Sequence, residues 1–201
     1  MKDADIHQAI PDNYTKQELT IDPAKAQTAA FLYFIPFLIL FVVPYYILWK
    51  QNLSIAECKN VLSAYGKWGI LVIPVVVLLG IIIHELIHGL TWSVFAKKGL
   101  RSISYGIIWK WLTPYCHCSE PLSVRHYIIG GIMPAIILGF LPCVFAILTG
   151  SLSLLVFGLF FTLAAGGDFM IINMLRNEPM QNLVQDHPSK IGCFIYKPAV
   201  N

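Results

Sequence analysis

Four long apolar blocks constrain the fold of this chain more than any other feature. They cover residues 28–49, 68–96, 127–149 and 152–175, and each reaches the ~20 residues that a helix needs to cross a bilayer. Apolar residues make up 57% of the chain and charged residues only 12%, about half the charge of a typical soluble protein. The sequence therefore predicts an integral membrane protein with four helical spans and the lipid bilayer as its solvent.

The polar segments between the blocks predict how the chain is arranged across the membrane. The N-terminal segment 1–27, the loop 97–125 and the tail 176–201 carry 11 of the 14 Lys and Arg residues. Basic residues collect on the cytoplasmic side of membrane proteins, so both termini are expected in the cytoplasm. We expect one domain over residues 1–201, with a cytoplasmic N-terminal segment (1–27), a four-span core (28–175) and a cytoplasmic tail (176–201). The net charge is only +3 and no basic cluster alternates with aromatic residues, so no nucleic-acid partner is expected.

The loop between the second and third blocks has the periodicity of a strand. Apolar side chains occupy alternate positions at Ile103, Tyr105, Ile107, Trp109 and Trp111. This alternation is typical of a β-strand. A turn at Thr113 and Pro114, followed by residues 115–119, would complete a β-hairpin, with an irregular interfacial loop as the alternative. The predicted fold class is therefore an all-α membrane protein with four transmembrane helices and a small interfacial β-hairpin between helices two and three.

A shorter signal lies between the first two blocks. Ser54 and Glu57 have the spacing of a capping box, in which each side chain bonds a free main-chain N–H at the start of a helix. This spacing predicts a short surface helix that ends near Tyr65.

Ionisable residues inside the apolar blocks are rare, and their types indicate a metal site. Of the 11 Asp and Glu residues only Glu85 and Asp168 lie within a block, and of the six His residues only His84 and His88 do. A charged side chain in the middle of a bilayer costs roughly 2.5–3.5 kcal/mol on insertion scales. Each of these residues therefore needs an explanation, and all four belong to the types that bind or serve a catalytic zinc ion.

The segment His84-Glu85-Leu86-Ile87-His88 has the HExxH spacing of zinc metallopeptidases. Two histidines four residues apart lie on one face of a helix, where both imidazoles can bind one metal ion. Glu85 lies about a quarter turn away, from where its carboxylate can accept a proton from water and later donate it to the leaving amine. The alternative is a pair of buried histidines that bond the main chain or water.

Asp168 is the expected third ligand, because a catalytic zinc ion usually takes three protein ligands. His88 lies nine residues before Lys97, and Asp168 lies eight residues before Arg176. At 1.5 Å per helical residue, both side chains fall about 12–14 Å below the cytoplasmic ends of their spans. Gly166 and Gly167 would let the fourth span approach its neighbour closely. The alternative role for Asp168 is a helix cap or a bond within the bundle.

Two further residues are candidates for contact with a substrate. His117 lies in the triplet Cys116-His117-Cys118. On a strand the two cysteines share one face and His117 points the other way, which disfavours a second metal site at the triplet. Ordinary interfacial packing is the alternative. Asn173 lies beyond Asp168 in the same block and could bond a substrate main chain or an oxyanion, or it could make a polar contact between helices.

Several of these segments together resemble a family of bacterial membrane proteins called putative zincin peptidases. The matching stretches are residues 84–89, 113–118 with 120–122, 167–168 and 186–192. That family is similar to the site-2 proteases, intramembrane zinc enzymes that cut substrate helices after these unwind. In those enzymes an Asp in a later span is the third ligand, which corresponds to Asp168 here. The chain has Gly166-Gly167-Asp168-Phe169 in place of the longer Asn-Pro and Leu-Asp-Gly context, so the Asn that grips the substrate does not carry over.

The resemblance implies a zinc-dependent metalloendopeptidase of the bacterial inner membrane, with one Zn²⁺ per chain and a membrane-associated protein or peptide substrate. It also implies a substrate held in extended form, which the edge of the predicted hairpin could bind as an added strand. The competing function is a zinc-binding membrane protein without turnover, such as a scaffold, sensor or transporter. Such a site has no need of Glu85, and a transporter would be expected to show acidic residues or histidines in the first and third blocks, which have none. A purely structural membrane protein is the third possibility.

Overall fold

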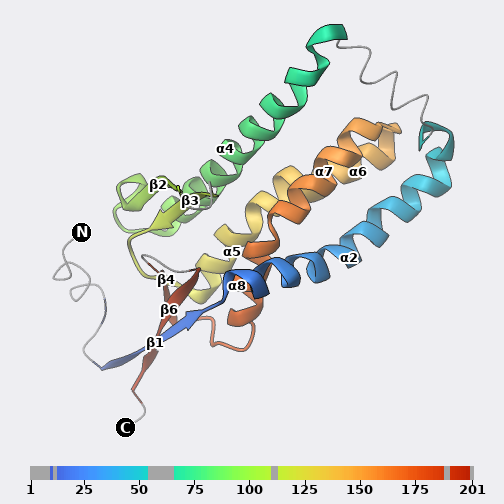
Figure 1. Cartoon of the computed structure of the whole chain (residues 1–201). Helices are drawn as coiled ribbons and strands as arrows, with labels where there is room; N and C mark the ends of the chain where they lie inside the picture. The colour runs from blue at the N-terminus through green and yellow to red at the C-terminus, as the bar shows by residue number, and fades with distance from the viewer. Residues whose placement is uncertain (1–9, 11–12, 54–65, 110–112, 188–190, 200–201) are drawn as a thin grey trace.

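A helical bundle forms most of the protein, as the computed structural model shows for residues 10, 13–53, 66–109, 113–187 and 191–199 (Figure 1). The main helices are α2 (Pro23–Trp49), α4 (Gly69–Phe95), α5 (Val124–Pro134), α6 (Leu141–Thr149), α7 (Leu152–Ala164) and α8 (Gly166–Leu175). A π-helical segment, η4 (Ala135–Phe140), joins α5 to α6 without a break, and the short 3-10 helices are η1 (Lys50–Leu53), η2 (Gly66–Trp68) and η3 (Gly99–Ser102). The predicted surface helix from Ser54 to Tyr65 falls outside the described residues.

Three helical runs are long and apolar enough to cross a membrane: Ala30–Asn52, Leu71–Phe95 and Val124–Thr149. A fourth candidate consists of α7 and α8, which together pass the same test but are bent by 46°. Many large apolar side chains on α2 and α4 are exposed, as expected where lipid covers them. These features agree with the prediction of a membrane protein, and the predicted number of four spans is reached only if α7 and α8 form one span together.

The fourth apolar block was predicted as one continuous helix, but the structure divides it into two helices. Helix α7 ends at Ala164 and α8 begins at Gly166, in a run of small residues that favours a kink. A Cβ atom on Gly166 would lie 2.3 Å from the Cβ atom of Ala30, whereas one on Gly167 would meet nothing within 4 Å. The predicted close approach therefore depends on Gly166 alone, and it holds α8 against α2. The break places Asp168 in the first turn of α8.

The predicted hairpin is present. Strands β2 (Ile103–Ile108) and β3 (Thr113–Cys118) pair antiparallel, with Gly106 opposite Tyr115 and Ile103 opposite Cys118. The predicted turn at Thr113 and Pro114 was wrong, because both residues already belong to β3 and face Ile108 and Ile107. Proline is tolerated there because either strand of a two-stranded sheet is an edge strand.

A second sheet was not predicted, so the expected all-α fold with a single hairpin was incomplete. Its four strands are β1 (Tyr14–Thr20), β6 (Gly192–Pro198), β5 (Leu183–Asp186) and β4 (Leu122–Ser123), in the order β1-β6-β5-β4 with antiparallel pairing. The sheet joins residues of the expected N-terminal segment to residues of the expected tail. Figure 1 shows it at the same end of the bundle as the hairpin.

One hydrophobic core connects this sheet to the helices. Its buried members include Trp92 on α4, Tyr127 on α5, Leu175 on α8, Val184 on β5 and Ile195 on β6. Cys118 at the end of β3 belongs to the same core. The two sheets are therefore packed against the ends of the helices that carry the ionisable residues.

Candidate metal centre

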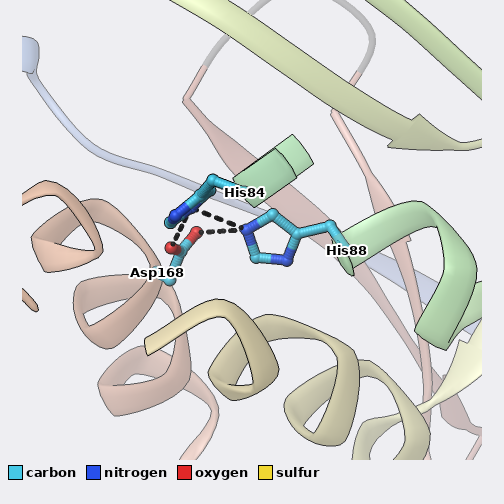
Figure 2. A group of neighbouring side chains, drawn as sticks. All are labelled: His84, His88 and Asp168. Atoms are coloured by element: carbon cyan, nitrogen blue, oxygen red, sulfur yellow. Dashed lines mark hydrogen bonds and ion pairs between the residues drawn. The ribbon is translucent and has the colours of Figure 1, made fainter. Parts of the chain in front are cut away.

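Three ionisable side chains from α4 and α8 converge in the bundle (Figure 2). His84 Nε2 lies 3.2 Å from Asp168 Oδ2, and His88 Nε2 lies 3.3 Å from Asp168 Oδ1. The two Nε2 atoms are 3.2 Å apart. Both histidines are buried, and the ligand atoms of the three residues all lie within 4.8 Å of one another. The structure thus brings together the three residues that the sequence predicted as metal ligands.

These three residues fit a zinc ion in both chemistry and spacing. Two imidazole nitrogens and a carboxylate are a common ligand set for zinc, which leaves one tetrahedral position open. With bonds of about 2.0–2.1 Å, neighbouring ligand atoms in a tetrahedron lie about 3.3 Å apart, close to the separations of 3.2–3.3 Å in the centre. When each imidazole carries its proton on Nδ1, the two facing Nε2 atoms bring two lone pairs together. A metal cation between them can accept both lone pairs.

The position of His88 is set by contacts on both sides of its ring. Its Nδ1 atom lies 2.9 Å from the carbonyl oxygen of Gly130 on α5, which makes Nδ1 the donor and leaves Nε2 free to bind metal. The indole of Trp92 stacks on the ring, with centroids 5.1 Å apart. His84 differs, because its buried Nδ1 atom has no hydrogen-bond partner among the described residues.

Glu85 lies beside the centre on α4 and is partly buried. The main chain of Cys116 on β3 lies near its carboxyl group. The hairpin approaches this part of α4 closely because residue 89 is glycine: a Cβ atom there would lie 2.1 Å from the Tyr105 hydroxyl oxygen and 2.7 Å from Ile103 Cγ2. The hairpin therefore covers the helix face next to the proposed general base.

The two candidate substrate residues lie outside the three-ligand cluster. His117 Nδ1 is 3.7 Å from Asp186 Oδ2, and Asn173 Oδ1 accepts a 3.1 Å hydrogen bond from the Arg176 guanidinium. Neither contact tests a role in substrate binding, so both roles stay predictions. Cys118 is buried, and burial raises the pKa of its thiol to about 12. In the described part of the chain, His84, His88 and Asp168 are the one group of three or more His, Cys, Asp or Glu residues close enough to share a metal ion.

Two carboxylates that connect the segments around the centre were not predicted from the sequence. Asp186 accepts hydrogen bonds from the Tyr127 hydroxyl group at 2.5 Å and from the Cys118 main-chain N–H at 2.8 Å. Glu120 accepts from the main-chain N–H groups of Lys97 and Lys98 and from the Ser102 hydroxyl group. Both carboxylates lie in stretches that resemble the zincin peptidase family, residues 120–122 and 186–192. Their hydrogen-bond partners are distant in sequence, so no local pattern identifies these bonds.

A cavity of about 300 Å³ lies away from the metal centre. Phe95, Lys97, Glu120 and His126 are among its lining residues, and none of the three metal-centre residues is. A metal site needs converging ligands more than it needs open volume, so the position of this cavity does not weigh against the cluster of His84, His88 and Asp168.

Comparison with known proteins identifies the family. Residues 77–183 match a family described as "Putative zincin peptidase". The chain belongs to this family. The matched segment contains His84, Glu85, His88 and Asp168, so the three residues that could hold a metal ion lie within the part of the chain that the family covers. No curated protein and no solved structure gives a significant match.

Membership of the zincin peptidase family suggests a zinc metallopeptidase, and the geometry supplies residues that can hold its metal ion. The candidate spans suggest that this metallopeptidase is a membrane protein.

Proposed function

We propose that the protein is a membrane-embedded zinc metallopeptidase that hydrolyses peptide bonds of membrane or membrane-proximal proteins. The observation that carries the proposal is the convergence of His84, His88 and Asp168 between two apolar helices, in a chain of the zincin peptidase family. His84, His88 and Asp168 would hold one Zn²⁺ per chain. When bound, the metal ion would polarise the scissile carbonyl group and lower the pKa of water.

Glu85 is the proposed general base. It is next to His84 in sequence, so its carboxylate starts from the same turn of α4 as the metal ligands. Its role is to take a proton from the attacking water and to pass that proton to the leaving amine. The main chain of Cys116 on β3 lies near this carboxylate. A non-catalytic zinc site would gain nothing from this arrangement.

The hairpin is the proposed site of substrate capture. A peptide bond within a helix is shielded, so the substrate must be extended before water can attack it, and an extended segment can add to the edge of a sheet. Tyr105, Ile107 and Trp109 are exposed on or next to β2, where they can contact a substrate strand. Proline or charged substitutions along residues 103–109 should therefore reduce cleavage. Cleavage that stays at the wild-type rate in all such variants would exclude this role.

His117 and Asn173 are the proposed substrate-binding side chains. Replacing either with Ala should raise KM more than it lowers kcat, because binding contacts away from the reacting atoms act on ground state and transition state alike. An unchanged KM in both variants would remove the two residues from the site.

The inner membrane, with both termini in the cytoplasm, is the proposed location. The arrangement of β1 and β6 in one sheet supports placing the two chain ends on the same side, and the excess of Lys and Arg in the flanking segments supports the cytoplasmic side. Cysteine labelling of intact and opened cells tests this: single cysteines at positions 15 and 197 should react only in opened cells. Labelling in intact cells would reverse the orientation.

The function is tested by Glu85→Gln beside wild type in detergent. The variant should keep its zinc ion and lose cleavage by at least about 100-fold, because only proton transfer is removed. A variant that cleaves like the wild type would exclude Glu85 as the base. Zinc without cleavage in the wild type, across a panel of membrane substrates, would favour the non-catalytic scaffold or sensor.

A further inference from the structure

The carbonyl oxygen of Gly130 bonds a side chain although it lies inside a helix. It accepts the 2.9 Å hydrogen bond from His88 Nδ1, and Gly130 belongs to α5. In a regular α-helix this oxygen would accept from the N–H group four residues later. That residue is Pro134, which has no N–H group. The next residue, Ala135, donates its N–H to the carbonyl oxygen of Ile132 instead.

Proline also affects where this carbonyl group points. Its ring clashes with the carbonyl four residues earlier and turns that group away from the helix axis. Pro134 is fully buried, so its ring is held in place by neighbours. Gly130 completes the arrangement on the side of α4, because a Cβ atom at this position would lie 2.0 Å from Trp92 Nε1. The indole that stacks on His88 therefore packs directly against the residue whose carbonyl group His88 bonds.

The bond to Gly130 decides which nitrogen of His88 can bind metal. A carbonyl oxygen only accepts, so Nδ1 must carry the proton and Nε2 must present its lone pair. Nε2 faces His84 and Asp168. Nδ1 of His88 donates a hydrogen bond to this main-chain carbonyl group, whereas Nδ1 of His84 has no hydrogen-bond partner among the described residues. The orientation of the centre therefore depends strongly on the Gly130 carbonyl group.

We propose that Pro134 is a positioning residue for the metal centre: it withholds a main-chain donor from the Gly130 carbonyl group and so reserves that oxygen for His88. The inference rests on the proposed function in that the centre binds zinc. Any other residue at position 134 would supply an N–H group four residues after Gly130. That group would compete with His88 for the oxygen and draw the carbonyl back toward the helix axis.

The test compares Pro134→Ala, Pro134→Val and Pro142→Ala with wild type, all as full-length chains in detergent. The zinc dissociation constant is measured by competition with a chelator. Both Pro134 variants should bind zinc about tenfold or more weakly, the usual effect of removing a hydrogen bond to a metal-bound histidine. Pro142→Ala is the matched control, because Pro142 lies in the same candidate span and its substitution would engage a carbonyl group of η4 instead of that of Gly130. Its affinity should equal that of wild type.

The valine variant separates hydrogen bonding from packing. Valine fills about the volume of the proline ring but still carries an N–H group, so wild-type affinity in Pro134→Val with loss in Pro134→Ala would show a packing effect and overturn the proposal. Wild-type affinity in both variants would overturn it too.

A spectroscopic measurement on wild type avoids any folding defect of the variants. In ¹⁵N-histidine-labelled, zinc-loaded protein, the signal assigned to His88 through the His88→Asn variant should show the proton on Nδ1 and the metal on Nε2. A proton on Nε2 would overturn the inference while leaving zinc binding intact. A wild type that binds no zinc would instead refute the proposed function.

Discussion

The hydroxyl group of Tyr127 donates a 2.5 Å hydrogen bond to Asp186 Oδ1, which joins helix α5 to strand β5 behind the metal centre. The other carboxylate oxygen accepts from the Cys118 main-chain N–H on β3. On its other side, Tyr127 stacks on Trp92, and Trp92 stacks on His88. A single carboxylate of the C-terminal sheet is thus linked both to the hairpin beside Glu85 and, through two rings, to a metal ligand.

Replacing Asp186 should loosen the hairpin without removing metal. In Asp186→Ala the Tyr127 hydroxyl group and the Cys118 N–H lose a buried acceptor, which should lower the free energy of unfolding by about 1–3 kcal/mol. Cleavage should fall about tenfold or more, because β3 no longer holds its place over Glu85, while zinc content stays at the wild-type level. Glu178→Gln is the control: it weakens the ion pair with Lys197 elsewhere in the structure and should cost less than about 1 kcal/mol. Equal effects of the two substitutions on cleavage would contradict the assignment.

The close packing of the hairpin on α4 predicts a compensating pair of substitutions. Gly89→Ala should displace Tyr105, whose hydroxyl oxygen would lie 2.1 Å from the new Cβ atom, and such overpacking costs about 1–3 kcal/mol. Thermal unfolding and cleavage should both report this loss, and adding Tyr105→Ala should recover part of it. Gly167→Ala introduces a methyl group that meets no atom of another segment within 4 Å and serves as the control. No recovery in the double variant would show that Tyr105 is not the displaced group.

Glu120 predicts a pH-dependent contribution to stability. Burial acts to raise the pKa of its carboxyl group, but hydrogen bonds from Ser102, Lys97 and Lys98 outweigh burial and hold the pKa below its ordinary value of 4.5. A carboxyl group whose pKa is lower in the folded state than in the unfolded state stabilises the protein at every pH above the ordinary pKa. This stabilisation is lost as the pH falls through the folded-state pKa.

Glu120→Gln should therefore be less stable than wild type at pH 7, by about 1.5–3 kcal/mol for a charged hydrogen-bond acceptor. Thermal unfolding of both proteins between pH 7 and pH 3 should show the difference shrinking below the ordinary value. A difference that stays constant over this range would mean that the Glu120 charge is not what stabilises the connection between α4 and the hairpin.

The metal centre could be predicted from sequence because its signals are local or chemically rare. His84 and His88 are one helical turn apart. Asp168 is an ionisable residue inside an apolar block, where a charge is energetically unfavourable unless another group pairs with it. The hairpin could be predicted from the alternation of apolar side chains from Ile103 to Trp111, although the predicted turn at Thr113 and Pro114 was wrong. Each of these inferences needed only a short window of sequence.

The four-stranded sheet could not be assembled in the same way. Strand β1 is almost entirely exposed and pairs with β6 more than 170 residues later, so its own side chains give no amphipathic signal. A usable signal was present in β6, where Cys193, Phe194, Ile195 and Tyr196 form a short apolar run after Gly192, typical of a buried strand. The bend at Ala165 likewise had a signal in the two glycines that follow it.

Metal content per chain tests the central claim most directly. Mass spectrometry on detergent-purified wild type, His84→Ala and Asp168→Ala should find about one zinc ion per chain in the wild type and a large loss in both variants, because each variant removes one of three ligands. Zinc that remains at the wild-type level in Asp168→Ala would show that the third ligand is misassigned. A wild type that binds no zinc after reconstitution at neutral pH would contradict the metallopeptidase account as a whole.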